Sequence, residues 1–195
     1  LTFWNDELAR EGAAITWRRR EAMDTLALLS AQQHGELTGG EERLCLEYRP
    51  NVVPGDSLPD TESRLREALV ACHRRELATS ATMVGPHRDD FELLVKGVDM
   101  GTFASRGQAR TLALTLRLAE AAYLASTRGE GPIILLDDVL SETDAHRRHR
   151  VLEKATQYQQ VLITTTDVEP IRLFFGPSAT YFRVESGGVW PRADG

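Results

Sequence analysis

Two adjacent aspartates directly after an apolar run are the residues of this sequence best suited to chemistry. Asp137 and Asp138 follow residues 133–136, Ile-Ile-Leu-Leu. An acidic residue just beyond a buried strand lies at the carboxyl end of that strand, where ligands bind in open α/β sheets. In nucleotide hydrolases such an aspartate coordinates Mg²⁺, and the next acidic residue orients or deprotonates the attacking water. The spacing predicts these two roles for Asp137 and Asp138, although many buried strands also end in an aspartate.

A second segment, Ser105-Arg106-Gly107-Gln108, stands just before a stretch rich in alanine and leucine, residues 111–123. Serine is a favoured N-cap, and glycine lets the backbone approach a bound group closely. The free N–H groups of a helix N-terminus can hold a phosphate. An ordinary serine cap followed by a turn glycine would explain the same residues. The segment lies one helix upstream of the acidic strand, which is the position of the signature sequence in ABC-type ATPases.

Two further segments follow the acidic pair in the order that such an ATPase head requires. Residues 141–144, Ser-Glu-Thr-Asp, lie at the distance of the loop that crosses the dimer interface. Residues 164–167, Thr-Thr-Thr-Asp, end the next predicted strand, where a γ-phosphate sensor belongs. Each segment is a weak signal by itself. Together, in this order and spacing, the four favour an ATP-binding head.

Four motifs and the opening of the chain resemble the RecF family of recombinational-repair proteins. The motifs are GPHRDD (85–90), FASRGQART (103–111), LLDDVLSETD (135–144) and TTTD (164–167), and the opening WNDELAREGAAI is similar to the start of that family's helical second lobe. The resemblance covers essentially the whole chain. SMC proteins and other ABC-type repair ATPases usually have a glutamate after the metal-binding aspartate and a histidine sensor. Asp138 and the threonines therefore favour the RecF family.

The resemblance implies ATP and Mg²⁺ as cofactors and a role for each matching residue. Asp137 would coordinate Mg²⁺, and Asp138 would act on the water, with a short acid that suggests slow hydrolysis. The signature residues that would touch the γ-phosphate of ATP bound to the partner subunit are Ser105, Arg106, Gly107 and Gln108. The residues of the interface-crossing loop would be Ser141 and Asp144, and those of the sensor Thr166 and Asp167.

One residue and one short segment have no role that follows from the residues alone. Arg106 replaces the family's usual glutamine, and its added charge could help to hold phosphate or could hinder closure. His87, Arg88 and Asp89 match a family motif. A tight turn held by an Arg–Asp pair explains that motif as well as a binding role does.

The resemblance also implies partners and a process. The expected protein is an ATP-dependent DNA-binding protein of recombinational and replication-gap repair that belongs to the SOS response. It would form a homodimer around ATP on duplex DNA or at single-strand/duplex junctions. It would help to load recombinase together with mediators of the RecR and RecO type.

The phosphate-binding loop that such a head needs is not found in the sequence. That loop requires Gly-Lys followed by Ser or Thr, whose lysine reaches the β- and γ-phosphates. The only lysines are Lys96, after Val95, and Lys154, after Glu153. We therefore expect a fragment that lacks the N-terminal portion of the protein. The full-length protein would be a slow ATPase, and this fragment alone would be inactive and would bind ATP poorly.

The expected fold class is α/β. Residues 83–195 should form the C-terminal part of an ABC-type ATPase head, with a mostly parallel sheet flanked by helices. Residues 1–82 should form a helical second lobe. In the lobe, an apolar stripe from Leu1 to Leu29 predicts one long helix or a helix pair that stops within the glycines of 34–40. A strand at 44–48 and a second helix, capped by Asp60 or Thr61, should follow.

In the head, residues 91–95 should form a strand, and a returning strand should end near Phe103. The run at 133–136 should be a strand buried on both faces of the sheet. A helix at 144–158 and strands at 160–164 and 180–185 complete the prediction.

Composition and charge fit a cytoplasmic protein. The chain of 195 residues is 42% hydrophobic and 27% charged, with a formal net charge of −6. It has no run of the ~20 apolar residues that span a membrane, and its first residues do not form a secretory signal. Two scattered cysteines favour a reducing compartment. Arginine clusters at 18–20, 74–75 and 147–150 could contact phosphates or simply be solvated helix faces.

Three other functions stay open at this point. An SMC-like structural ATPase head would need a long coiled-coil arm, for which the N-terminal helices are too short. A nucleotide-free interaction module would have little use for Ser105, Asp137 and Asp138. A metal-dependent nuclease would need further carboxylates on neighbouring strands.

Overall fold

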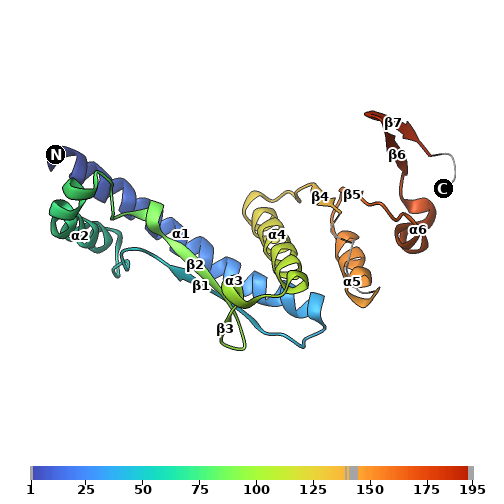
Figure 1. The fold of residues 1–195 in the computed structure, drawn as a ribbon, viewed down its shortest axis with the longest axis horizontal. Coiled ribbons are helices and arrows are strands. Elements are labelled where there is room, and N and C mark those ends of the chain that lie inside the picture. Colours follow the sequence, from blue (N-terminus) through green and yellow to red (C-terminus); the bar gives the residue numbers. More distant parts are fainter. Residues whose placement is uncertain (1, 139, 141–144, 193–195) are drawn as a thin grey trace.

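The computed structural model describes residues 2–138, 140 and 145–192 (Figure 1). The helices are α1 (Thr2–Thr38), α2 (Leu58–Thr79), α3 (Met100–Phe103), α4 (Arg106–Arg128), α5 (Ala145–Ala155) and α6 (Glu169–Phe175), with 3₁₀ turns η1 (Pro86–Arg88) and η2 (Gly176–Ser178). The strands are β1 (Leu44–Arg49), β2 (Asp90–Val95), β3 (Val98–Asp99), β4 (Ile134–Asp137), β5 (Val161–Thr164), β6 (Phe182–Glu185) and β7 (Gly188–Pro191). The predicted α/β class is confirmed.

The N-terminal apolar stripe belongs to one helix of 37 residues, α1, rather than to a helix pair. The helix ends where Gly39 and Gly40 take positive φ values of 69° and 80°, which glycine adopts without strain. Gly40 N–H donates to Gly35 O at 2.8 Å and so satisfies a terminal carbonyl. Figure 1 shows α1 passing beside α2 near its N-terminal end and beside α4 further along.

The second helix begins earlier than the sequence predicted, so the prediction that Asp60 or Thr61 caps it is wrong. Ser57 is the N-cap, and its side chain accepts a hydrogen bond from Asp60 N–H at 3.2 Å. Pro59 then fits the first turn, because proline there gives up only an N–H that would have no partner inside the helix. Buried Leu65 and Leu69 of α2 pack against two alanines of α1, Ala9 and Ala13.

The first sheet is antiparallel, in the order β1-β2-β3, with Leu44 opposite Val95 and Arg49 opposite Asp90. The prediction of a strand that returns as far as Phe103 is wrong, because β3 stops at Asp99 and the chain enters α3. Asp99 causes the change: its carboxylate accepts hydrogen bonds from Gly101 N–H at 2.9 Å and from Thr102 Oγ1 at 2.6 Å. Such a cap starts a helix and ends the ladder.

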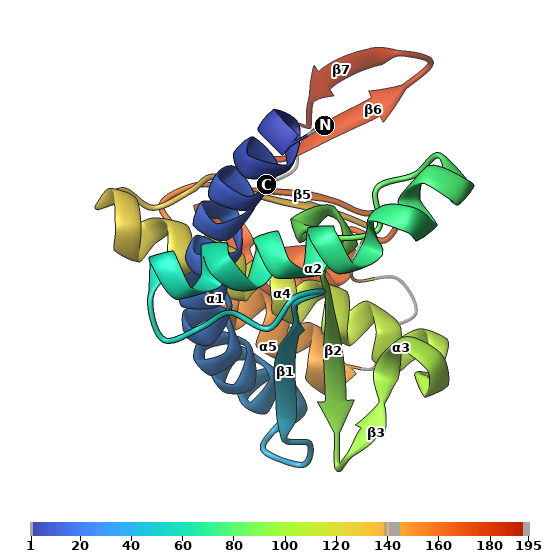
Figure 2. The same ribbon diagram turned by 90° about the vertical axis from the view of Figure 1, so that its left-hand side faces the viewer.

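The predicted division of the chain after residue 82 is crossed by close contacts. β1 lies before that boundary and β2 after it, yet they pair along their whole lengths. Helix α1 likewise packs on α4 and α5 as well as on α2. Figure 2 shows α2 and the β1-β2-β3 sheet from the side. The division into two domains stays a prediction.

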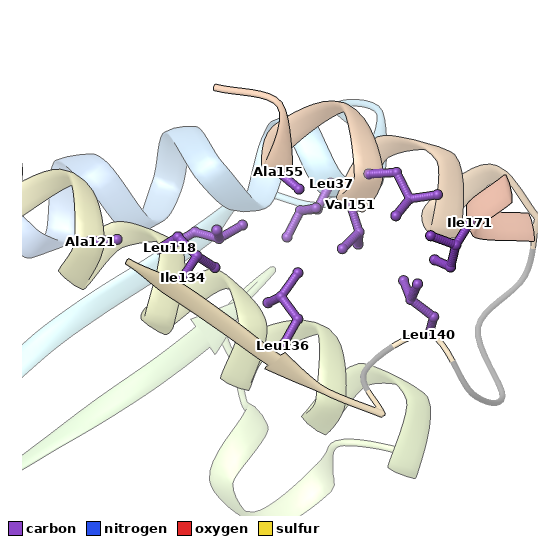
Figure 3. Packing of buried hydrophobic residues seen from close by; sticks show 10 residues of the cluster. Leu37, Leu118, Ala121, Ile134, Leu136, Leu140, Val151, Ala155 and Ile171 are labelled. Carbon is purple, nitrogen blue, oxygen red and sulfur yellow. The ribbon is translucent and has the colours of Figure 1, made fainter. Parts of the chain in front are cut away.

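The second sheet is parallel and pairs β4 with β5, from Ile134 opposite Val161 to Asp137 opposite Thr164. One face packs on the main hydrophobic core, in which Leu136 meets Leu37 of α1 and Val151 of α5 (Figure 3). The other face is open: Leu135 is 71% exposed. The prediction that this run is buried on both faces is therefore wrong for this chain, because the helices of the core cluster cover only one face.

The C-terminal region matches the prediction in part. Helix α5 and strands β5 and β6 lie within the predicted ranges, whereas α6 and β7 were not predicted. β6 and β7 form an antiparallel hairpin that projects from the rest of the chain (Figure 2). Among the described helices, none is long and apolar enough to cross a bilayer.

Candidate functional site

The acidic pair lies where two neighbouring parallel strands end. Asp137 is the last residue of β4, opposite Thr164 at the end of β5. Thr164 Oγ1 donates to Asp137 Oδ1 at 2.5 Å. Asp138 N–H donates to both the backbone oxygen of Thr164, at 3.2 Å, and its Oγ1, at 3.1 Å. Thr164 thus fixes the orientation of one carboxylate and the backbone of the next residue.

Asp138 turns the chain away from the strand. Its φ is +49°, a left-handed conformation that aspartate tolerates better than most residues. Both aspartates are exposed at this edge of the sheet. The carboxylates therefore face solvent at the carboxyl ends of β4 and β5, where the sequence predicted a ligand.

The role of Asp137 as a ligand of Mg²⁺ stays a prediction, and it is compatible with an ion that is shared with phosphate. Mg²⁺ is typically held by one or two carboxylates, with substrate phosphates and waters completing its octahedron. No group of three or more His, Cys, Asp or Glu residues within the described part of the chain could enclose a metal ion. Asp137 would therefore provide one ligand of such an ion, with the others coming from phosphate and water.

A cavity of about 360 Å³ adjoins the acidic pair, between the end of α1 and the elements α4, β4 and α5. Its apolar lining includes Leu37, Leu136 and Val151, which also belong to the main core. Its polar lining comprises Arg110, Thr111, Arg117, Asp137, Asp138 and Arg147. Residues one to three turns into α4 thus lie beside the acidic residues at the end of β4.

Two arginines of the predicted 147–150 cluster make contacts within the chain. Arg147 NH1 donates to Thr111 Oγ1 of α4 at 3.2 Å. Arg150 NH1 donates to the backbone oxygen of Leu37, near the end of α1, at 3.2 Å. These side chains hold α5 against α4 and α1, so they have a structural role whether or not they also contact phosphate.

The predicted signature segment caps α4. Ser105 Oγ accepts from Gln108 N–H at 3.3 Å, and Gln108 Oε1 accepts from Ser105 N–H at 3.0 Å, which completes a capping box. Arg106 and Gly107 are exposed in the first turn. The ordinary serine cap is thus present. A contact of this segment with nucleotide stays a prediction.

Gly107 has no role in the fold of this chain that would require glycine. Its φ is not positive, and a Cβ built on it would meet nothing within 4 Å. Glycine in a helix generally costs about 0.5–1 kcal/mol relative to alanine. The missing side chain therefore leaves open space on the outside of α4, where another molecule could approach the backbone closely.

The residues of the TTTD segment, 164–167, make different contacts. Thr164 contacts Asp137, as described above. Thr165 Oγ1 donates to Asp167 O at 2.9 Å and accepts from Asp167 N–H at 3.1 Å, which shapes the turn. Asp167 Oδ1 accepts from Glu169 N–H at 3.2 Å, while Thr166 is exposed. Ser141 and Asp144 of the predicted interface loop lie outside the described residues.

Thr164 is the site residue that the sequence analysis missed, since the sensor was predicted at Thr166 and Asp167. The signal that could have identified it is strand register. If β4 and β5 are parallel neighbours and both end at the same edge, the last residue of each is paired, and a hydroxyl next to a carboxylate forms a hydrogen bond.

The GPHRDD motif has its centre in Asp89, whose side chain is only 4% exposed. Its carboxylate accepts from Tyr48 OH at 2.5 Å, from Asn51 N–H at 2.8 Å and from Arg19 NH1 at 3.1 Å. Arg19 also donates to Pro86 O at 2.5 Å. An Arg–Asp pair does hold this turn, but the arginine comes from α1. Arg88 instead donates to the backbone oxygen of Thr82.

The environment of Tyr48 is set by the same carboxylate. Burial raises the pKa of Tyr48 above its ordinary value, and the hydrogen bond to Asp89 raises it further because that bond needs the phenol proton. Gly85, at the start of the motif, has φ +134°, a conformation open almost only to glycine. The motif thus joins α1, the end of β1 and the start of β2 through polar contacts to one nearly buried carboxylate.

Known proteins are similar to this chain along nearly its whole length. No family model matches it. The DNA replication and repair protein RecF of Synechococcus sp. strain JA-3-3Ab is 37% identical over 194 residues, which cover 98% of this chain and 51% of that protein. RecF of Chloroflexus aggregans is 39% identical over 194 residues, which cover 97% of this chain and 49% of that protein. The chain belongs to the RecF family.

Solved structures agree with this assignment. Two structures of the recombination mediator protein RecF in the RecFOR pathway, described as RecF-ATP and RecF-ATPrS, superpose with TM-scores of 0.81 and 0.80 at 30% sequence identity. Each comparison covers 99% of this chain and 50% of the solved RecF chain. The chain therefore has the fold of the matching half of RecF, and it spans about half the length of the RecF relatives that it matches.

Proposed function

We propose that this chain is the part of an ATP-dependent DNA-binding protein that contributes the acidic strand and the signature helix of an ABC-type ATPase head. The whole protein acts in recombinational and replication-gap repair, dimerises around ATP on duplex or junction DNA and helps to load recombinase. The observation that supports this most directly is the contact of Thr164 with Asp137 at the carboxyl ends of two parallel strands. The similarity to RecF-ATP structures supports it independently.

Within the head, each residue predicted from the motifs has a proposed task. Asp137 holds Mg²⁺, with Thr164 fixing the orientation of its carboxylate, and Asp138 acts on the attacking water. When bound, Mg²⁺ neutralises charge that develops on the phosphates. Thr166 and Asp167 form the sensor, and Ser141 with Asp144 the interface loop. The Gly-Lys-Ser/Thr cradle is not in this sequence, so another segment must supply it.

The signature segment is proposed to act on nucleotide held by a second copy. Ser105, Arg106 and Gly107 lie at the exposed N-terminus of α4, where free N–H groups attract phosphate. A glycine that this chain's own fold does not require at position 107 supports the close approach of an outside group. Dimerisation around ATP follows if that group is the γ-phosphate bound by the partner subunit.

Partners and location extend the proposal beyond the described residues. The family resemblance favours duplex DNA, single-strand/duplex junctions and mediators of the RecR and RecO type as partners. It also favours the cytoplasm as location. The solved RecF structures are described within the RecFOR pathway, which supports a mediator context.

ATP-dependent dimerisation of the complete protein tests the proposal. Sedimentation velocity with Mg²⁺, with and without ATP, should show a dimer for the wild type and a monomer for Ser105→Arg, whose bulk and charge block the approach of the partner's phosphate. Ser57→Arg is the matched control, because Ser57 is also an exposed serine N-cap, on α2. It should dimerise like the wild type. If Ser105→Arg dimerises equally, or the wild type does not dimerise, the clamp mechanism is wrong and a nucleotide-free module replaces it.

A further inference from the structure

A buried histidine joins the long helix α1 to the signature helix α4. His34, one turn from the end of α1, is 1% exposed. Its Nδ1 lies 3.2 Å from Thr115 Oγ1 of α4, and its Nε2 lies 3.0 Å from Glu42 Oε2, in the connection between α1 and β1. Thr115 is itself fully buried. None of the proposed roles in nucleotide binding uses these three side chains.

Both ring nitrogens of His34 have a hydrogen-bond partner. An ionised Glu42 can only accept, here from Nε2–H. The hydroxyl of Thr115 can accept from Nδ1–H or donate to Nδ1, and its oxygen also lies 2.8 Å from Thr111 O. The ring is thus held on one side by a carboxylate and on the other by a hydroxyl. Near this end of α1, Lys154 of α5 pairs with Glu36 of α1, and Arg150 of α5 donates to the backbone oxygen of Leu37.

The contact with Thr115 continues along α4 towards the signature segment. Thr115 bonds to the backbone of Thr111, and Thr111 Oγ1 donates to the backbone oxygen of Gly107 at 3.0 Å. Thr111 Oγ1 also accepts from Arg147 of α5. Hydrogen bonds thus connect His34 to Gly107 along two turns of α4. A further hydrogen bond connects Thr111 to Arg147 of α5.

The hydrogen bond between His34 and Thr115 can fix the register of α1 against α4, which apolar contacts alone would not do. Leucine side chains can slide along one another at little cost, whereas a hydrogen bond between two buried groups fixes one register of the helices, and breaking it leaves a buried ring nitrogen without a partner. The same region of α1 packs Leu37 into the main core. The apolar contacts therefore hold α1 in place, and the polar pair selects its position relative to α4.

We propose that His34 is a positioning residue: held by Glu42 and bonded to Thr115, it fixes the register of α1 against α4 and thereby places the Ser105–Gln108 segment for action on the partner's nucleotide. This inference rests on the proposed function for the identity of the nucleotide step. The link itself, a buried histidine hydrogen-bonded between α1 and α4, stands independently of that function.

Substitutions at Thr115 test the positioning role in the complete protein. Thr115→Val is isosteric but removes the hydroxyl, and it should lower kcat for ATP hydrolysis about tenfold, because the signature segment is then no longer held in one position. KM should stay unchanged, because the signature segment acts after nucleotide is bound. Thr115→Ser should restore the rate. Thr127→Val is the control: Thr127 makes the same i−4 hydroxyl bond on α4 but is exposed, so this variant should match the wild type. Equal rates in Thr115→Val and Thr127→Val, or a loss that serine does not restore, overturn the proposal.

A double-mutant cycle supplies a second readout, which does not depend on ATP turnover. His34→Gln and Thr115→Val break the same buried contact, so in urea unfolding the double variant should lose less unfolding free energy than the sum of the two single variants. His34→Gln combined with Thr127→Val is the control and should be additive, because Thr127 does not contact His34. Additive losses for His34→Gln with Thr115→Val overturn the proposal. If the wild type neither dimerises with ATP nor hydrolyses it, the proposed function fails, and this cycle still decides whether the link exists.

Discussion

Replacing Asp89 by asparagine should weaken the fold, although the two side chains have nearly the same shape. Asp89 is the acceptor for three donors that come from α1, β1 and the segment after β1. Asparagine has nearly the same shape but offers one acceptor oxygen and places an NH₂ group where the second oxygen was. At least one donor then faces another donor in a nearly buried site.

The loss in the free energy of unfolding depends on which of the three hydrogen bonds to Asp89 the asparagine can keep. The amide oxygen can still accept from Asn51 N–H, so that bond is weakened but kept. Arg19 is 47% exposed and keeps Pro86 O, so its loss costs little. Tyr48 loses a bond to a charged acceptor, worth about 1.5–3 kcal/mol. Together we expect a loss of about 2–3 kcal/mol in the free energy of unfolding, or a fall in Tm of about 5–10 °C for a chain of this size.

Urea unfolding followed by far-UV circular dichroism measures the loss. Asp90→Asn is the matched control: Asp90 is the adjacent acid of the motif, it is exposed, and its carboxylate accepts only from the N–H of Phe91 among the described contacts. It should change the unfolding free energy by less than about 0.5 kcal/mol. If Asp89→Asn and Asp90→Asn unfold at the same urea concentration, the buried network does not hold the three segments together and the reasoning is refuted.

Three further predictions concern single side chains. Tyr48 holds its proton in the folded state at pH values where the unfolded chain, with an ordinary tyrosine pKa of about 10, has lost it. Its stabilising contribution is therefore present below that pH and is lost above it, so the unfolding free energy of the wild type should fall more steeply above about pH 10 than that of Tyr48→Phe. Gly107→Ala should leave stability unchanged or raise it by up to about 1 kcal/mol, yet weaken ATP-dependent dimerisation measured by sedimentation; dimerisation at the wild-type level would mean that no group approaches Gly107 closely. Thr164→Val should lower Mg²⁺-dependent ATP turnover of the complete protein about tenfold, whereas Thr164→Ser should not; full activity in the valine variant would show that Asp137 needs no hydroxyl.

Local patterns predicted most of the elements and the place of the acidic pair. An apolar run followed by two aspartates marks the end of β4, and a serine before an alanine-rich stretch marks the start of α4, because strand burial and helix capping depend on neighbouring residues. Two of the misses among the elements, the start of α2 and the end of β3, have the same origin. Asp99 and Ser57 are caps too, and a cap just outside the expected helix shifts its start, or begins a helix where a strand was predicted.

Contacts between distant residues could not be predicted in this way. Arg19 and Asp89 are 70 positions apart, and Asp137 and Thr164 are 27 apart. Each pairing depends on how helices and strands pack, which a single sequence does not specify. The prediction of two buried sheet faces failed for a related reason: four apolar residues in a row show that a strand can be covered on both sides, but not that this chain supplies both covers.

Because α1 is one unbroken helix, a small rotation at one of its ends gives a large displacement at the other. At 1.5 Å per residue, 37 residues extend about 55 Å. One end is held by α2 through Ala9 and Ala13, the other by α4 and α5 through His34 and Leu37. A tilt of about 5° about the His34 end would move the opposite end of a rod of that length by about 5 Å. A rotation too small to disturb the core around Leu37 would thus displace the helix pair α1–α2 by several ångströms. Conversely, a displacement of that pair by several ångströms would rotate α1 by only a few degrees where it contacts α4.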